Sequence, residues 1–482
     1  MMWFYLKKNL FWSVCALWFV WAGAAHGSTG KPDTLFRTLV DAVIAGNLDQ
    51  VKTAVAQLQI YNKTQVYSGC QNCFTLHSSI GLTFDSQDTV KSYQDGDIVE
   101  IKENPEQLPA RYQGKSPLMI ALQTEKSRQQ YMDEFGALDG FVKADQATVA
   151  GDPFYAIFMY LLSHATAPGQ MSDQERVNRG LFLLDLNQGF TVLEPWQEKQ
   201  SYVVRRGRTL LMQALIASKH SRHCHSDVES AQSKIPGLIP TKCSVWEKLA
   251  AMRDRYVNVD GQKLYLIDHF DINQGDAVGK NVLTYAITTS NCPANLDPIN
   301  SFFRYFLTTM SSLKRDGENR AFIGYYKPNF YLGDVHGDTP LMYFVGQCIH
   351  TYSELMTEFS LEKIQQFAVS KIALGLNPFQ RNLNGLALED FVSHDIPNQG
   401  LFTRSLLQKL IENFKDDFYK TFHSKQENTI SNITKEIDRA SRTLKKVTED
   451  GFSTQGLTID RLESYIKNLQ AAQSGLELVF ED

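Results

Sequence analysis

Near the start of the chain, apolar residues recur at helical spacing. Leu35, Leu39, Ala42 and Val43 fall on one face when residues 35–45 are placed on an α-helix. Gly46-Asn47 then supplies a helix end, and residues 48–55 begin a second apolar pattern of the same period. The pattern therefore predicts two short antiparallel helices joined by a tight turn.

A two-residue alternation follows within residues 59–113. Residues 81–84 and 97–101 both place apolar and polar side chains at alternate positions, as in Asp97-Ile98-Val99-Glu100-Ile101. Such alternation is typical of half-buried strands. It predicts a small β-hairpin inserted between helical units.

A turn followed at once by a helix start then recurs along the chain, most completely in the block Gly337-Asp338-Thr339-Pro340-Leu341-Met342. Glycine suits a left-handed turn, threonine can cap the helix, and proline is favoured at the first helical position. Apolar residues spaced three and four apart follow, so the block predicts the start of an amphipathic helix.

Weaker copies of this block begin at Gly114, Gly207, Gly279 and Gly385. Their glycines are separated by 93, 72, 58 and 48 residues, counting Gly337 in sequence. A second signature, an Asx-containing helix end, precedes several copies, at residues 183–187, 271–276 and 373–378. Recurrence of both signatures indicates a repeat protein.

The extra residues between copies predict insertions near 59–113, 123–206 and 219–270. Apolar runs at residues 154–162, 302–307 and 355–374 have the length and period of buried helices. We therefore expect these three runs to form lengthened second helices joined by loops, with their aromatic residues in the core.

The pattern changes in residues 401–482. In residues 430–447, Ile430, Ile433, Ile437, Ala440, Leu444 and Val447 step by three and four, which is a heptad seam. The seam is short for a free coiled coil, and solenoids need capped ends, so a terminal helical hairpin or bundle is favoured. The alternative is a seam through which two chains associate.

The repeated blocks resemble the ankyrin repeat, most closely at residues 337–345 and 375–378. Two departures stand out. The histidine that follows Thr-Pro-Leu in that family is replaced by Met119, Met212, Thr284 and Met342. The spacings also exceed the ankyrin unit of about 33 residues. The resemblance implies an all-α, ankyrin-like solenoid over residues 28–400, closed by a C-terminal helical cap, and a non-enzymatic role as a protein–protein interaction scaffold.

The first 27 residues have the features of an export signal. Lys7 and Lys8 precede an apolar run of sixteen residues, 10–25, and Ala22-Gly23-Ala24 is a small-x-small cleavage site. This run is shorter than the roughly 20 residues that span a bilayer, which favours a cleaved signal and a periplasmic or secreted protein. The alternative is a membrane anchor formed by residues 3–25.

Composition, net charge and the motifs that are absent exclude several classes of function. The chain is 43% hydrophobic and 21% charged, typical of a folded protein, and its net charge is -5. General nucleic-acid binding usually requires a basic excess, so we expect no nucleic-acid partner. No phosphate-binding loop, nucleophile elbow or zinc-protease motif is present, so the sequence indicates neither an enzyme nor a cofactor.

Six of the seven cysteines follow the predicted signal, which is compatible with three disulfides in an exported chain. The local pairs are Cys70 with Cys73 and Cys224 with Cys243, which leaves Cys292 and Cys348; buried free thiols are the alternative. Cys70-x-x-Cys73 has the spacing of a redox pair. It lacks the strand-then-helix setting that lowers a thiol pKa, so a structural disulfide loop is favoured.

The remaining candidate is the run His220-Ser221-Arg222-His223-Cys224-His225-Ser226-Asp227. Imidazole, thiolate and carboxylate groups are ligands for zinc or copper, which makes His220, His223, Cys224 and His225 metal candidates. Their spacing matches no standard closed site, and a loop held by a Cys224–Cys243 disulfide is favoured instead. A metal-binding or hydrolytic protein is therefore the alternative function.

Overall fold

The structure of the chain is a computed structural model. It describes the following residues: 31–79, 94–101, 107–126, 128–146, 151–196, 201–220, 244–289, 332–343, 377–388 and short helical stretches or single positions between 390 and 473. Among these residues, no helix is long and apolar enough to cross a membrane. The predicted signal, residues 1–27, lies outside the described residues.

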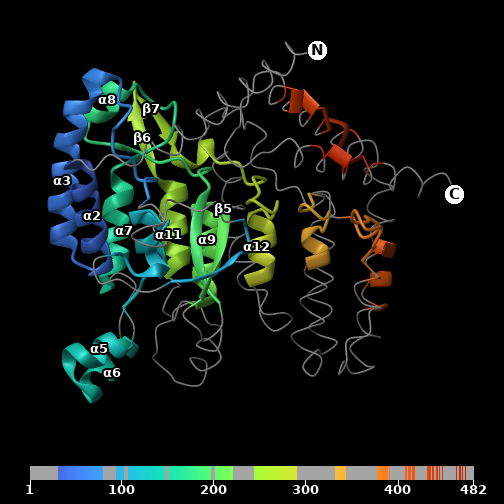
Figure 1. Cartoon of the computed structure of the whole chain (residues 1–482), viewed down its shortest axis with the longest axis horizontal. Helices are drawn as coiled ribbons and strands as arrows, with labels where there is room; N and C mark the ends of the chain where they lie inside the picture. The colour runs from blue at the N-terminus through green and yellow to red at the C-terminus, as the bar shows by residue number, and fades with distance from the viewer. Residues whose placement is uncertain are drawn as a thin grey trace, which may run out of the picture.

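Two layers of helices form the body of the molecule (Figure 1). The first layer contains α2 (Lys31–Ile44), α4 (Pro117–Gln123), α9 (Leu210–His220) and α12 (Val282–Thr289). The second layer contains α3 (Leu48–Gln65), α7 (Pro153–Ser163) and α11 (Ser244–Asp254). Each first-layer helix packs on the next one, and α2, α4 and α9 also pack on α3, α7 and α11 respectively. The described chain is thus a stack of helix pairs.

The helix pairs form where the apolar periodicity predicts them. In α2, Leu39, Val40, Ala42 and Val43 are buried, and in α3, Val51, Ala54, Val55 and Leu58. Gly46 turns the chain with φ +68°, and the Asn47 side chain accepts the Gln50 N–H to cap α3. The expected αα-hairpin at the start of the described chain is therefore present.

The expectation of an all-α fold is wrong. Among the described residues, helices account for about 53% and strands for 13%, and the strands form three small sheets. A three-stranded antiparallel sheet has the order β1 (Ile98–Glu100), β5 (Ser201–Arg208), β4 (Phe190–Pro195). The two-stranded sheets are parallel β2 (Ala165–Thr166) with β3 (Phe182–Leu183) and antiparallel β6 (Tyr256–Val259) with β7 (Gln262–Tyr265).

Strand β1 lies in the insertion that was expected to hold a β-hairpin, whereas the other strands lie in or beside insertions that were expected to hold helices and loops. Both β4 and β5 bury consecutive residues, such as Val192-Leu193 and Val203-Val204, so neither shows the strict two-residue period of a half-exposed strand. Strand β1 lies in one of the two segments expected to pair in a hairpin, but it pairs with β5, about 100 residues away. Its expected partner, residues 81–84, lies outside the described residues.

Short elements complete the insertions. They are η1 (Val66–Ser68), η2 (Ala110–Tyr112), α5 (Arg128–Phe135), α6 (Ala137–Gln146), α8 (Asp173–Asn178) and η5 (Leu266–His269). The pair α5–α6 projects away from the stack (Figure 1). Its Leu138 is 79% exposed.

Little of the predicted C-terminal unit, residues 401–482, is described, and what is described is helical. Ile411, Ile433 and Leu469 are buried in the main core cluster, and Ile437 packs against it. Two positions of the predicted heptad seam are thus covered by other residues of the chain. The seam positions 430, 440 and 447 lie outside the described side chains.

Candidate functional site

The repeated blocks form matching turns at one edge of the helix stack. Their glycines all have positive φ: +75° at Gly114, +72° at Gly207, +85° at Gly279, +80° at Gly337 and +76° at Gly385. This conformation is available to glycine without the Cβ clash that other residues suffer. The conformational requirement explains why glycine recurs there.

Two residues after the glycine, a side-chain oxygen caps the following helix. Ser116, Thr209, Asn281 and Thr339 each accept the N–H of the residue three positions on. These bonds satisfy a main-chain donor that the helix itself leaves free. The capping that the sequence predicts is therefore present in four of the copies.

Three residues before the glycine, a buried Asx side chain holds the turn together. Oδ1 of Asp276 accepts the N–H groups of Val278 and Lys280 at 3.1 and 2.8 Å. Asp334 and Asn382 make the same two bonds, to the residues two and four positions later. One acceptor thus fixes both sides of each turn.

The second oxygen of each aspartate binds a tyrosine from the following helix. Tyr285 donates to Asp276 Oδ2 at 2.7 Å, and Tyr343 donates to Asp334 Oδ2 at 2.6 Å. Burial raises the pKa of both tyrosines, and the adjacent carboxylates add to the rise. Burial also raises the pKa of Asp276. Both tyrosines therefore stay protonated as hydrogen-bond donors.

A cation from the preceding unit lies over each of these tyrosine rings. The Arg208 guanidinium is 5.0 Å from the Tyr285 centroid, and Lys280 Nζ is 4.6 Å from that of Tyr343. Both cations follow the turn glycine directly, at Gly207 and Gly279. Cation–π contacts therefore link consecutive units in a regular way.

Main-chain hydrogen bonds also join neighbouring turns. Ala277 N donates to Arg206 O at 3.0 Å, Val335 N to Val278 O at 3.0 Å, and Leu383 N to His336 O at 2.9 Å. We call Arg206, Val278, His336 and Leu383 the turn-tip strip. Val278 is half-buried, the other three are exposed, and Leu383 is 48% exposed. The strip is a continuous row of side chains presented by four rigidly connected turns.

The arginines near the strip have acidic partners within the chain. Glu194 on β4 binds Arg208 and Arg205, both at 3.2 Å, and these contacts hold its carboxyl pKa below the ordinary value against the effect of burial. Asp95 accepts the main-chain N–H of Arg206 at 2.7 Å. Arg205 and Arg208 are paired with Glu194, whereas the side chain of Arg206 is exposed to solvent at the strip.

A second feature with chemical character is the loop after α3. Cys70 and Cys73 form a disulfide; both residues are partly exposed, and Gln71 and Asn72 between them are exposed. The buried Asn62 side chain accepts the Phe74 N–H at 2.7 Å and donates to the Phe74 carbonyl at 3.0 Å. These two bonds fix the end of the loop on α3.

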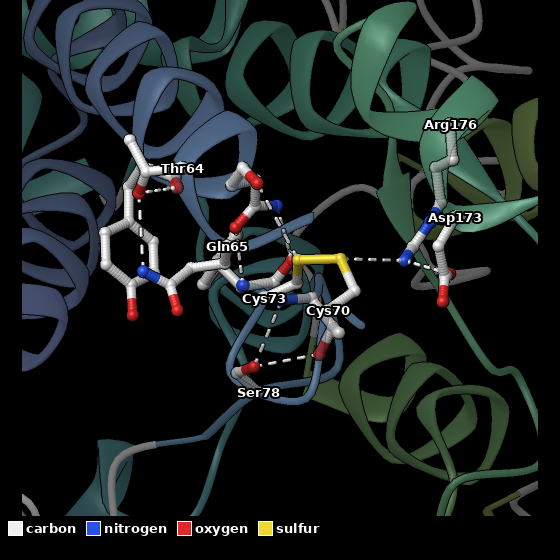
Figure 2. The surroundings of a disulfide bond; sticks show 11 residues. Thr64, Gln65, Cys70, Cys73, Ser78, Asp173 and Arg176 are labelled. Atoms are coloured by element: carbon white, nitrogen blue, oxygen red, sulfur yellow. Dashed lines mark hydrogen bonds and ion pairs between the residues drawn. A yellow bond between two sulfur atoms is a disulfide. The ribbon is translucent and has the colours of Figure 1, made fainter. Parts of the chain in front are cut away.

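A buried guanidinium approaches this disulfide from α8 (Figure 2). Nη2 of Arg176 donates to Cys70 Sγ at 3.6 Å and also binds the Asp173 carboxylate. The Arg176 side chain is 5% exposed, and its Nη1 has no hydrogen-bond partner among the described residues. On the other side, Cys73 Sγ lies 3.9 Å from the Asn62 main-chain oxygen. The two sulfurs therefore have different electrostatic surroundings.

A histidine adjoins the same region without adding charge. Nδ1 of His77 accepts the Asp185 N–H at 3.2 Å. Burial lowers the His77 pKa, Asp185 opposes this effect, and Arg176 adds to it. His77 is therefore neutral near pH 7, and Arg176 remains the cation at the disulfide.

The predicted metal candidates are not brought together in the described structure. His220 is the last residue of α9, and His223, Cys224, His225 and Cys243 lie outside the described residues, as do Cys292 and Cys348. Within the described part of the chain, no group of three or more metal-ligating side chains occurs. The predicted pairings of these four cysteines stay predictions.

Sequence reasoning missed two sets of residues. Asp276, Asp334 and Asn382 share one offset before the turn glycine, and an alignment of the copies on that glycine would reveal them. Arg176 is 106 residues from Cys70, and no local pattern marks their contact.

Comparison with known proteins adds no further assignment, because no family model, curated protein or solved structure matches the chain.

Proposed function

We propose that the chain is a non-enzymatic binding protein of the ankyrin-repeat type, which recognises a protein partner through its stacked turns. The observation that carries this proposal is the turn-tip strip. Successive turns are joined by main-chain hydrogen bonds, and they present exposed side chains at regular intervals. Repeat arrays bind partners through such extended surfaces, while their buried motif residues maintain the stack.

The strip suits protein recognition for two physical reasons. The turns are held by buried Asx side chains and by contacts between units, so little conformational entropy is lost when a partner binds. The strip also combines an apolar side chain, Leu383, with a cation, Arg206, and an imidazole, His336. A partner with an apolar contact residue and a nearby carboxylate would complement it.

Substitution of the strip tests this function. The full chain and its Leu383→Asp and Arg206→Glu variants would be used to capture partners, and each captured protein would then be titrated against all three. We expect affinity to fall at least about tenfold, or 1.4 kcal/mol, in both variants. Because both side chains are exposed, the variants should unfold at the wild-type temperature.

Leu138→Asp is the matched control, because Leu138 is 79% exposed but lies on the projecting α5–α6 pair. A genuine partner should bind this variant as it binds the wild type. If the captured protein binds all four chains equally, the strip is not its binding surface and the proposal fails.

We also propose export of the chain, from the N-terminal signal pattern. The Cys70–Cys73 disulfide supports it, because disulfides persist in oxidising compartments. N-terminal sequencing of the protein recovered from the cells tests cleavage. A chain that still begins with Met1 would contradict it and favour the anchor formed by residues 3–25.

A further inference from the structure

We propose that the Cys70–Cys73 disulfide is a thiol–disulfide exchange site, whose substrate is an external dithiol such as a cysteine pair on another polypeptide. The proposal rests on the difference between the surroundings of the two sulfurs, and it is independent of the turn-tip strip. Spacing alone does not show this function, since many Cys-x-x-Cys disulfides are only structural. The placement of Arg176 and Asn62 distinguishes this one.

The Cys70 side of the pair stabilises negative charge. When the disulfide opens, a thiolate on Cys70 would lie beside the Arg176 guanidinium, which already donates to its sulfur at 3.6 Å. The guanidinium is buried, so water screens this attraction poorly. Its Nη1 has no hydrogen-bond partner among the described residues, so their contacts leave donor capacity unused. A positive neighbour of this kind lowers the pKa of a thiol.

The Cys73 side favours the protonated thiol. Its Sγ lies 3.9 Å from the main-chain carbonyl oxygen of Asn62. A carbonyl oxygen can accept a hydrogen bond from S–H but repels a thiolate. Asn62 cannot turn away, because its side chain is bonded to both main-chain groups of Phe74. The pair is therefore divided into a thiolate-forming Cys70 and a thiol-forming Cys73.

The exchange follows from this division. A thiolate of the external dithiol attacks Cys73 Sγ, the Sγ–Sγ bond breaks, and its electron pair leaves on Cys70 beside Arg176. The second thiolate of the dithiol then attacks the first sulfur of the same dithiol, which is bonded to Cys73 in the mixed disulfide. This step releases Cys73, which takes one proton. Two electrons pass to the cysteine pair, the dithiol becomes a disulfide, and its second proton goes to solvent.

Access to the site is provided by the loop. Both cysteines are partly exposed, Gln71 and Asn72 between them are exposed, and Tyr67 nearby is 89% exposed. Among the described residues, titratable groups near the pair include Arg176 and Asp173 on α8, with His77 and Asp185 next to them. Asp173 competes with a Cys70 thiolate for the same guanidinium. Opposite effects are therefore expected from changes at positions 176 and 173.

The test measures the pH at which each thiol becomes reactive in the reduced full chain. Iodoacetamide labelling across pH, with the label assigned to each cysteine by fragmentation of the peptide that contains both, should give Cys70 a midpoint below about 7.5, against about 8.5 for Cys73. The midpoint is the better readout, because a thiol of lower pKa is also a weaker nucleophile and labelling rates partly compensate. The expected order of the two midpoints distinguishes their roles.

Three variants at two positions separate electrostatics from damage to the fold. Arg176→Met should raise the Cys70 midpoint toward about 8.5, and Arg176→Lys should keep it below that value. Asp173→Asn should lower the midpoint further, because the guanidinium loses its competing carboxylate. A substitution that merely loosened the loop would not move the midpoint in opposite directions at these two positions.

Equilibration with a glutathione buffer supplies the second readout. For a Cys70 pKa between about 7 and 6, loss of the guanidinium should shift the equilibrium toward the disulfide about two- to tenfold at pH 7. If Cys70 and Cys73 share an ordinary midpoint, and none of the three variants changes it, the disulfide is structural only and the proposal is overturned.

Discussion

The Asp276 carboxylate stabilises its turn through three hydrogen bonds, two to main-chain N–H groups and one to Tyr285. Asp276→Ala would leave a buried hydroxyl and two turn donors without this acceptor. We expect a loss of about 2–4 kcal/mol in unfolding free energy. Chemical denaturation of the variant and the wild type measures it.

Asp276→Asn is the informative control. At the equivalent position, Asn382 accepts the same two main-chain donors through its Oδ1. The hydroxyl of Tyr285 can in turn accept from an amide nitrogen. We therefore expect a loss below about 1 kcal/mol. Equal losses in the Asn and Ala variants would show that the turn requires the negative charge of Asp276, rather than an oxygen that accepts two main-chain N–H groups.

Lys248 is a buried cation of the helix stack. It lies on α11 with 1% exposure, and Nζ donates to the carbonyls of Ala121 and Leu122 at 2.7 and 3.4 Å. These carbonyls are at the end of α4, where the helix leaves acceptors free and its dipole is negative. Burial nevertheless lowers the Lys248 pKa from 10.5 to about 8, although Asp152 and Glu125 oppose the effect.

This pKa predicts how stability depends on pH. Between about 8 and 10.5 the unfolded chain binds more protons at this site than the folded chain, so the unfolding free energy rises with pH in that window. The gain should approach about 3 kcal/mol. Denaturation from pH 7 to 10.5 should show a smaller rise in Lys248→Met than in the wild type. An identical rise in both chains would contradict the buried, titrating lysine.

Neighbouring turns lie so close together in part of the stack that two of the turn glycines are required for different reasons. A Cβ on Gly279 would lie 3.0 Å from Asp334 Cα, in the next turn, whereas a Cβ on Gly385 would meet nothing within 4 Å among the described residues. Both residues have positive φ. Gly279 is therefore required for conformation and for packing, and Gly385 for conformation alone.

Alanine at these two positions separates the two requirements. Gly385→Ala should cost about 1–2 kcal/mol, the penalty for a left-handed conformation in a residue with a Cβ. Gly279→Ala should cost at least about 1 kcal/mol more, because the next turn must move and weaken the Val335-to-Val278 hydrogen bond. Thermal unfolding measures both, and equal losses would show that the turns are not tightly stacked.

The elements that sequence patterns predicted are those determined by local contacts. A helix start needs only a glycine and a capping oxygen within three residues of its donor, which is why the starts of α4, α9 and α12 follow from the sequence. Strands β4 and β5 were missed because burial on both faces removes their alternation. The pairing of β1 with β5 was missed because no local signal specifies a partner so distant.

The candidate sites divide in the same way. Turn glycines and caps were recognised from spacing, and Cys70 and Cys73 were recognised as a pair. The residue that gives the pair its asymmetry, Arg176, is brought in by α8 and by the parallel pairing of β2 with β3. Such a contact depends on packing between insertions, for which a single sequence contains no periodic signal.

For the whole molecule, the β4–β5 hairpin is an insertion within a single turn. Gly275 and Gly279 are separated by three residues, and a Cβ on Gly275 would approach Gly279 O to 2.7 Å. Gly189 and Gly207 are just as close, at 2.8 Å from Cβ to Cα, yet 17 residues separate them. The hairpin therefore leaves and re-enters the stack at the position of an ordinary turn.

This geometry predicts that the hairpin can be replaced by a short turn. In the proposed graft, residues 190–206 are exchanged for Asp-Ala-Val, the residues between Gly275 and Gly279. The grafted valine would occupy the position of Arg206, and its carbonyl could accept the Ala277 N–H as Arg206 does now. The grafted aspartate would bracket the turn as Asp276 does.

We expect the grafted chain to keep its helical stack and to unfold cooperatively, at a lower temperature than the wild type. Phe190 and Val192 leave the main core and the buried Arg208 loses Glu194, which together account for the loss, whereas Leu193 and Val204 belong to a small separate cluster with Val99. A graft of Ala-Ala-Val, which lacks the bracketing carboxylate, should unfold at a lower temperature still. Circular dichroism and thermal unfolding of both grafts test this, and loss of helical signal in the Asp-Ala-Val graft would mean that the sheet is an integral part of the stack.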